Sequence, residues 1–215
     1  MNGLKFLPKK WNLLGIFAMG NSSGHNTAMT IPPGKGPYKV GCTDLMVGHT
    51  IQGTFMRIYY PCQEHENPHR PDWVPCREYF NGLADFMKIN RGLSERIFNY
   101  LFGSCKIPAA WNASFKPDGK YPVIIFSHGL GAFRTLYSAI CVELASQGFI
   151  VAAVEHRDES SSATFYFREN PEPGKKHHSS YDKAKPVSEN LEEVWMYYRP
   201  LKTGENEFPL RNKQV

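Results

Sequence analysis

The residues with the clearest chemical meaning are His128-Gly129-Leu130-Gly131. Glycine at two of four positions lets the backbone turn sharply and approach a ligand closely. Main-chain N–H groups in such a turn can stabilise the negative charge that develops on the carbonyl oxygen of an attacked ester. We expect the Leu130 N–H to be such an oxyanion donor, and His128, Gly129 and Gly131 to support the loop. The alternative is a tight strand-to-helix connection without chemistry, because short motifs have chance matches.

The segments around this loop predict a strand, a helix and a second strand. Residues 123–126 are a β-branched and aromatic run, typical of a parallel strand that is covered on both faces. Apolar residues recur at helical spacing over residues 134–148, and residues 149–154 form a second buried strand. This order predicts a parallel strand–helix–strand unit of the α/β class. The charged residues 155–158 then lie at the carboxyl edge of the sheet, and we favour a hydrogen-bonded strand end there over direct catalysis.

Longer stretches resemble a known family. Residues 126–139, followed by residues 155–158, are similar to the platelet-activating factor acetylhydrolase family, the plasma and type II intracellular lipases that release short or oxidised acyl chains from phospholipids. The similarity continues in order over residues 31–215 and is closer to the type II intracellular branch, for example at residues 190–195. Residues 42–46 look closer to the plasma branch.

This resemblance implies an α/β-hydrolase fold, of which the chain would hold the amino-terminal half of the sheet, before the nucleophile elbow. It also implies hydrolysis of the sn-2 ester of a 1-alkyl-2-acetylglycerophosphocholine through an acyl-serine. The substrate would be a phospholipid, and no metal or organic cofactor would be needed. Two alternatives stay open. One is another ester or lipid hydrolase of the same fold, and the other is a non-catalytic short isoform or an incomplete gene model.

The nucleophile of such an enzyme cannot be assigned in this sequence. The fold supplies its triad in the order Ser, Asp, His, with the serine on a Gly-x-Ser-x-Gly elbow. No elbow follows Asp158, so we expect the 215-residue chain to be inactive alone. The string at residues 20–24 matches the pattern at Ser22, but it precedes the predicted sheet and no helix is expected after it. Ser127 and His128 are adjacent, so a hydrogen bond between their side chains is not expected.

Residues 78–102 predict two short amphipathic helices with a break near residues 90–92. Such a pattern either packs on the sheet or forms an interfacial face that contacts a membrane or lipoprotein surface. The residues that would face substrate or membrane are Leu93, Ile97, Phe98 and Leu101.

Composition and charge narrow the class of protein. Hydrophobic residues make up 41% of the chain and charged residues 21%, which is ordinary for a globular domain. The net charge of +5 comes from scattered basic residues without a nucleic-acid-binding module, so we expect no nucleic acid partner. His177 and His178 lack further ligands at metal-binding spacing, so no metal site is predicted. Five cysteines without disulfide or metal spacing favour free thiols in a reducing compartment.

The organisation of the chain follows from these patterns. We expect residues 1–30 to be a variable or targeting segment, with features of a weak signal peptide. The expected location is cytoplasmic, with or without membrane association, and secretion is the alternative. Residues 31–215 form the partial hydrolase domain, with first strands near residues 39–41 and 53–60. Residues 168–189 are an expected mobile insertion, and a further helix is expected to begin at residue 191.

Overall fold

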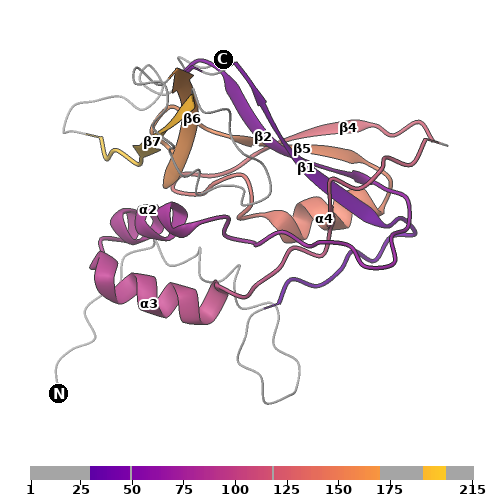
Figure 1. The fold of residues 1–215 in the computed structure, drawn as a ribbon, viewed down its shortest axis with the longest axis horizontal. Coiled ribbons are helices and arrows are strands. Elements are labelled where there is room, and N and C mark those ends of the chain that lie inside the picture. The colour runs from indigo at the N-terminus through magenta and orange to yellow at the C-terminus, as the bar shows by residue number, and fades with distance from the viewer. Residues whose placement is uncertain (1–29, 49, 118, 170–190, 202–215) are drawn as a thin grey trace, which may run out of the picture.

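A five-stranded mixed sheet forms the centre of the protein (Figure 1). The computed structural model describes residues 30–48, 50–117, 119–169 and 191–201. The strands are β1 (Val40–Val47), β2 (Thr54–Pro61), β3 (Ala110–Trp111), β4 (Val123–Ser127) and β5 (Ile150–Glu155), in the order β3-β1-β2-β5-β4. β2 is antiparallel to both of its neighbours, while β4 and β5 are parallel, as the sequence predicts. The expectations for Ser22, for His177 and His178 and for most of residues 168–189 lie outside the described residues.

In the part of the chain that the structure describes, three helices lie on one side of this sheet (Figure 1). They are α2 (Arg77–Met87), α3 (Arg91–Phe102) and α4 (Ser138–Ser146). α2 ends at Met87 and is capped by Lys88, which adopts a left-handed conformation with φ of 60°. α3 begins after Asn90, whose side chain accepts hydrogen bonds from the N–H groups of Gly92 and Leu93. The predicted pair of helices is therefore confirmed, but the break lies at residues 88–90, earlier than the predicted 90–92, because the Asn90 side chain lets the helix begin at Arg91.

α4 begins four residues later than the apolar spacing predicts. Arg134 and Thr135 form hydrogen bonds outside the helix. The Arg134 N–H donates to Glu155 Oε2 at 3.2 Å, and Thr135 Oγ1 donates to the Trp73 carbonyl at 2.6 Å. Residues 134–137 instead form tight turns, in which the Leu136 N–H donates to the Phe133 carbonyl at 3.0 Å.

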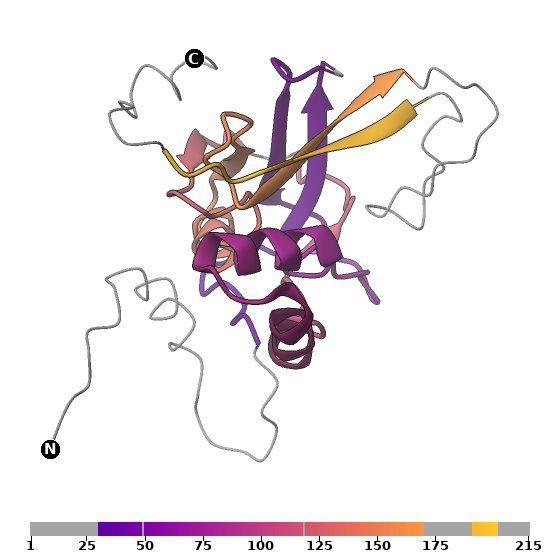
Figure 2. The same ribbon diagram turned by 90° about the vertical axis from the view of Figure 1, so that its left-hand side faces the viewer.

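A two-stranded hairpin corrects the expectation of a further helix at residue 191. β6 (Ala163–Glu169) and β7 (Leu191–Tyr197) pair antiparallel, with Phe165 opposite Trp195. The two rings are in contact at 4.8 Å between centroids, and Phe165 also packs on Phe55 of β2. These cross-strand contacts outweigh helix propensity in a segment rich in Val, Trp and Tyr. Figure 2 shows the hairpin above α2.

The expectation that both faces of β4 are covered is also wrong. Val123 and Ile125 are 64% and 75% exposed, whereas Ile124 and Phe126 are half-buried against the core. Among the described residues β4 pairs only with β5, and the helices cover only the face that carries Ile124 and Phe126. β4 is therefore an apolar edge strand in the described part of the chain.

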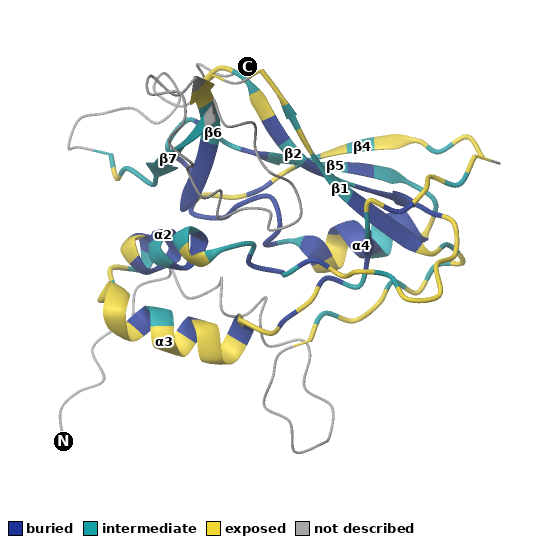
Figure 3. Ribbon diagram, viewed as in Figure 1, coloured by how far each residue is buried: buried dark blue, intermediate teal, exposed yellow. Residues whose placement is uncertain are grey.

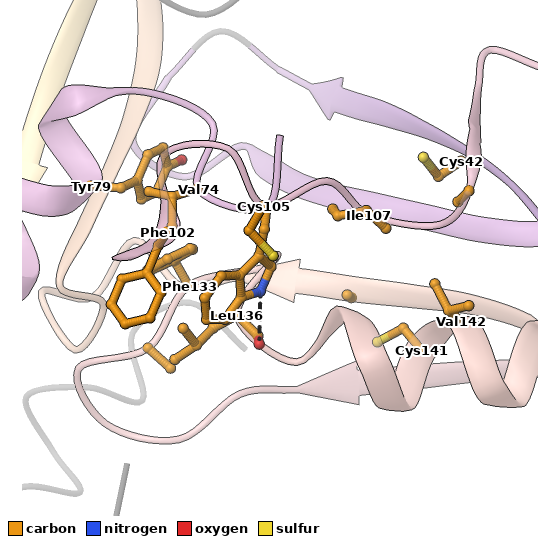
Figure 4. Packing of buried hydrophobic residues seen from close by; sticks show 14 of the residues in the cluster. Cys42, Val74, Tyr79, Phe102, Cys105, Ile107, Phe133, Leu136, Cys141 and Val142 are labelled. Atoms are coloured by element: carbon orange, nitrogen blue, oxygen red, sulfur yellow. Dashed lines mark hydrogen bonds between the residues drawn. The ribbon is translucent and has the colours of Figure 1, made fainter. Parts of the chain in front are cut away.

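The main core lies between the sheet and the helices (Figures 3 and 4). Trp73 packs edge-on against Phe102 at 5.6 Å, and its indole N–H donates to the Leu136 carbonyl at 3.2 Å. Tyr79 and Phe133 are in contact at 4.8 Å between ring centroids. The core thus joins α2 and α3 to the residues that precede α4, which is the segment where the predicted oxyanion loop lies.

Candidate functional site

The predicted loop lies at the carboxyl edge of the parallel strands β4 and β5. Residues 128–133 follow β4, and residues 156–162 follow β5 and pack beside them. This edge is where open α/β sheets bind their ligands. The Leu130 side chain is partly exposed, and within the described residues no protein acceptor takes its N–H. The Leu130 N–H is therefore available to a ligand oxygen.

Gly131 holds the loop in place through its backbone. Its φ is +73°, and a Cβ at this position would lie 2.3 Å from the Phe86 ring of α2. Its N–H donates to the Ser160 carbonyl at 2.8 Å, which ties the loop to the segment after β5. Gly129 differs, because a Cβ there would meet only the Tyr137 hydroxyl at 3.6 Å, an ordinary contact. Only Gly131 of the two glycines is thus required by conformation and space.

His128 is buried beneath the loop and bridges it to the end of β5. Its Nδ1 lies 2.9 Å from the Gly129 carbonyl oxygen, and the N–H of His156 donates to its Nε2 at 3.4 Å. The two imidazoles are stacked with centroids 4.0 Å apart. Burial lowers the pKa of His128 to about 4, helped by the nearby His156, so the ring is neutral at pH 7. Loop support by His128 stays a prediction, and these contacts are the observation behind it.

Glu155 connects the loop to a largely buried cluster of charged groups. Its carboxylate accepts hydrogen bonds from the Tyr79 hydroxyl at 2.6 Å, from Arg134 Nη1 at 2.8 Å and from the Arg134 N–H. The Arg134 guanidinium in turn donates to Asp44 at 2.9 Å. Arg157, two residues after Glu155, donates to the carbonyls of Thr50 and Gly53. Residues 155–157 are therefore a hydrogen-bonded strand end, as the sequence favours.

Asp44 and Arg57 complete this cluster, and the sequence did not single out either residue. Arg57 Nε donates to Asp44 Oδ1 at 2.7 Å, and the two residues are directly opposite each other in β1 and β2. Burial alone would raise the pKa of Asp44, but the guanidiniums of Arg134 and Arg57 hold it below its usual value. The signal was a pair of opposite charges facing each other across two strands. It was missed because the first strand was expected to end at Gly41.

Of the four residues predicted to face substrate or membrane, three are exposed and one is buried. Leu93, Ile97 and Leu101 are exposed on α3, together with Tyr100. Phe98 is buried, and it packs against Phe80 of α2 at 6.1 Å between ring centroids. Its assignment to an outer face is wrong, because α3 uses its 94–98–102 row to pack inward.

A cleft of about 480 Å³ lies away from this site. It is lined by residues around Tyr38, Lys39 and Glu64, where β1 begins and β2 ends. Because β1 runs parallel to β5, this is the opposite edge of the sheet from Leu130. Among the described residues no group of three His, Cys, Asp or Glu side chains could hold a metal ion. No helix in the described ranges is long and apolar enough to cross a membrane.

Known proteins are similar to this chain over most of its length. A platelet-activating factor acetylhydrolase of Gallus gallus is 51% identical over 195 residues, which cover 90% of this chain and 44% of that protein. One of Bos taurus is 51% identical over 185 residues, covering 86% of this chain and 38% of that protein. A solved ferulic acid esterase of Streptomyces cinnamoneus has a TM-score of 0.47 at 20% identity, covering 67% of this chain and 39% of the esterase chain.

The chain thus spans less than half the length of these curated relatives. Residues 23–215 match the family model described as platelet-activating factor acetylhydrolase, isoform II. The described sheet is accordingly part of an α/β-hydrolase fold, and the chain belongs to the isoform II platelet-activating factor acetylhydrolase family.

Proposed function

We propose that this chain is the oxyanion-loop part of a carboxylic-ester hydrolase that removes short or oxidised sn-2 acyl groups from ether phospholipids. The observation that carries the proposal is the Leu130 N–H, which points to no protein acceptor in the described residues and lies at the ligand-binding edge of the sheet. Family membership supports the choice of phospholipid ester over other esters. The reaction would use a serine nucleophile on a Gly-x-Ser-x-Gly elbow, and the described residues contain no such elbow.

The loop is built so that this N–H does not need to move during catalysis. Gly131, on one side, is fixed by its N–H bond to Ser160 and by the Phe86 ring. Arg134, further along, is fixed at its N–H and its guanidinium by Glu155. A donor that is already oriented stabilises a developing oxyanion without a reorganisation cost in the transition state. We therefore assign Leu130 its role through the backbone rather than the side chain.

The test compares two substitutions at Leu130 in an enzyme that contains this chain together with an elbow serine. Leu130→Pro removes the N–H and should lower turnover by about a hundred- to a thousandfold. Leu130→Ala keeps the N–H and should change turnover by less than about tenfold. Equal losses in two variants that both keep native circular dichroism would assign the effect to the side chain and refute the proposal.

We further propose that the outer face of α3 contacts a lipid surface. Leu93, Ile97, Tyr100 and Leu101 lie at spacings of three and four residues, so they share one side of the helix. The exposed Arg96 on the same helix suits anionic headgroups. Packing against another protein surface is the alternative use of such a face.

Vesicle binding tests this second proposal. Leu93 and Ile97 are 58% and 43% exposed. With full burial of such a side chain worth about 2 kcal/mol, replacing both by serine should cost about 2 kcal/mol, or about 30-fold in partitioning to phosphatidylcholine–phosphatidylserine vesicles. The control is Leu45→Ser, which removes a similarly exposed leucine from β1. Equal effects of the control and the double change would contradict a specific lipid face.

We also propose a reducing compartment, most simply the cytoplasm. The five cysteines form no disulfide with one another, and burial raises the pKa of thiols such as Cys42, to about 12. Such thiols are poorly reactive and behave as core side chains. Fractionation of cells that express the complete protein tests the proposal, and recovery in the secreted fraction would overturn it.

A further inference from the structure

A serine and a histidine meet at the carboxyl edge without a role in the proposal above. Ser127 is the last residue of β4, and His156 follows the last residue of β5. Ser127 lies opposite Val154 in the parallel ladder, which brings the next residues of β5 alongside the end of β4. Ser127 Oγ and His156 Nε2 are 2.8 Å apart, and the serine is exposed to solvent. Reasoning from sequence weighed Ser127 only against its neighbour His128 and missed this partner, 29 residues away.

The His156 ring is held in one orientation by several contacts. Its Nδ1 lies 3.1 Å from Ser160 Oγ, and the Ser160 N–H is bound by Asp158 Oδ1 at 3.0 Å. Stacking on His128 restrains the plane of the ring. In the tautomer with the proton on Nδ1, the Nδ1–H group donates a hydrogen bond to Ser160 Oγ. Nε2 is then an acceptor that faces Ser127 Oγ. A serine, a base in hydrogen-bond reach and a third group that orients the base are the parts of an activated nucleophile.

The protonation state suits a base. Burial lowers the pKa of His156, against the opposing effect of Asp158 and Glu155. The imidazole is therefore neutral at pH 7, with a lone pair available to accept a proton. The ring is half-buried beside Ser127, which is exposed and so open to an incoming reagent.

We propose that Ser127 is a second nucleophilic serine, distinct from the family's elbow serine, that is acylated by activated esters or phosphonylated by fluorophosphonates with His156 as its base. Ser127 Oγ forms a bond to the carbonyl carbon or phosphorus, and its proton passes to His156 Nε2. The bond to the leaving group breaks, and the imidazolium returns the proton to the leaving alcohol, phenol or fluoride. His156 Nδ1 contacts a hydroxyl instead of a carboxylate, so activation of water for deacylation is weak. The reaction therefore stops at one acyl group per chain.

The test is labelling of the 215-residue chain with a biotinylated fluorophosphonate, followed by peptide mass spectrometry. We expect one label at Ser127, none in Ser127→Ala, and no labelling of the protein in urea. His156→Gln removes the base and should slow labelling by about a hundredfold or more. Ser160→Ala leaves the base in place but removes its orienting hydroxyl, and should slow labelling severalfold. The matched control is Ser104→Ala, which removes another exposed serine and should change nothing.

Several results would overturn the proposal. One is a label on Ser22 or any other serine in place of Ser127. Another is an unchanged rate in His156→Gln, which would show that Ser127 reacts only because it is exposed. A third is the absence of any label on protein that keeps native circular dichroism. None of these results bears on Leu130, so the proposed oxyanion role stands or falls separately.

Discussion

The exposed edge of the sheet makes a quantitative prediction about self-association. Val123 and Ile125 of β4 are 64% and 75% exposed, and among the described residues no strand pairs with the outer side of β4. An apolar strand with unpaired backbone groups is a template for pairing with a second copy. We expect the 215-residue chain to form dimers and larger species through this edge at micromolar concentration.

Ile125→Lys is the perturbation that measures this contact. Burial of the whole isoleucine side chain is worth about 2 kcal/mol. Three quarters of Ile125 is exposed, and pairing at the edge would cover about half of that surface because the side chain stands on the open face of the sheet, so the contact is worth about 0.75 kcal/mol per chain. A symmetric pair contains two copies, so the substitution should weaken dimerisation by about 1.5 kcal/mol, or about tenfold. Lysine also places like charges across the new interface, which acts in the same direction.

Sedimentation equilibrium across a concentration series gives the dissociation constants. The control is Leu45→Lys, which adds the same charge at a leucine of β1 that is 41% exposed. We expect the control to change the constant by less than about threefold, since surface substitutions away from such features have small effects. A monomeric parent chain, or equal effects of the two lysines, would refute the argument from the β4 edge.

Three further predictions concern the loop and its chemistry. Gly131→Ala should lower the free energy of unfolding in urea by about 2 kcal/mol or more, because Gly131 has a positive φ and its new Cβ would meet the Phe86 ring. Gly129→Ala should lower it by less than about 1 kcal/mol. The reverse order would contradict the loop geometry. Because burial holds the pKa of His128 at about 4, against about 6.5 when unfolded, only the unfolded state takes up a proton as the pH falls from 7 to 5. The free energy of unfolding should therefore fall by about 2 kcal/mol at pH 5, and His128→Gln should remove most of this slope. Steady turnover of nitrophenyl esters by the 215-residue chain should not exceed that of buffer, and turnover that Ser22→Ala abolishes would disprove this.

Sequence patterns predicted the parts of the fold that depend on neighbouring residues. The strand, loop and helix around residues 123–148 and the two helices of residues 78–102 follow from periodicity and glycine placement, and the structure contains them. The strand at residue 191 was mistaken for a helix because its partner β6 lies on the other side of a long segment. Periodicity carries no information on such a partner.

The candidate site was predictable only in its backbone part. Leu130 and Gly131 follow from the loop motif, but the groups that hold the loop come from four distant segments, including Asp44, Tyr79 and Glu155. Phe98 shows the same limit on a smaller scale. The buried row 94–98–102 on α3 is shifted by one residue from the exposed row 93–97–101. Which of the two rows faces inward depends on where α2 packs.

The buried charge cluster constrains how the amino-terminal hairpin can pair. A slip of one residue between β1 and β2 would turn Asp44 to the opposite face of the sheet. Arg134 would then keep Glu155 but lose its second carboxylate partner while fully buried, which destabilises the slipped pairing. Arg134 therefore favours the correct alignment of β1 with β2, although it lies 90 residues after Asp44 in the sequence. Replacing either Asp44 or Arg134 alone is therefore expected to cost more stability than replacing both together by apolar side chains.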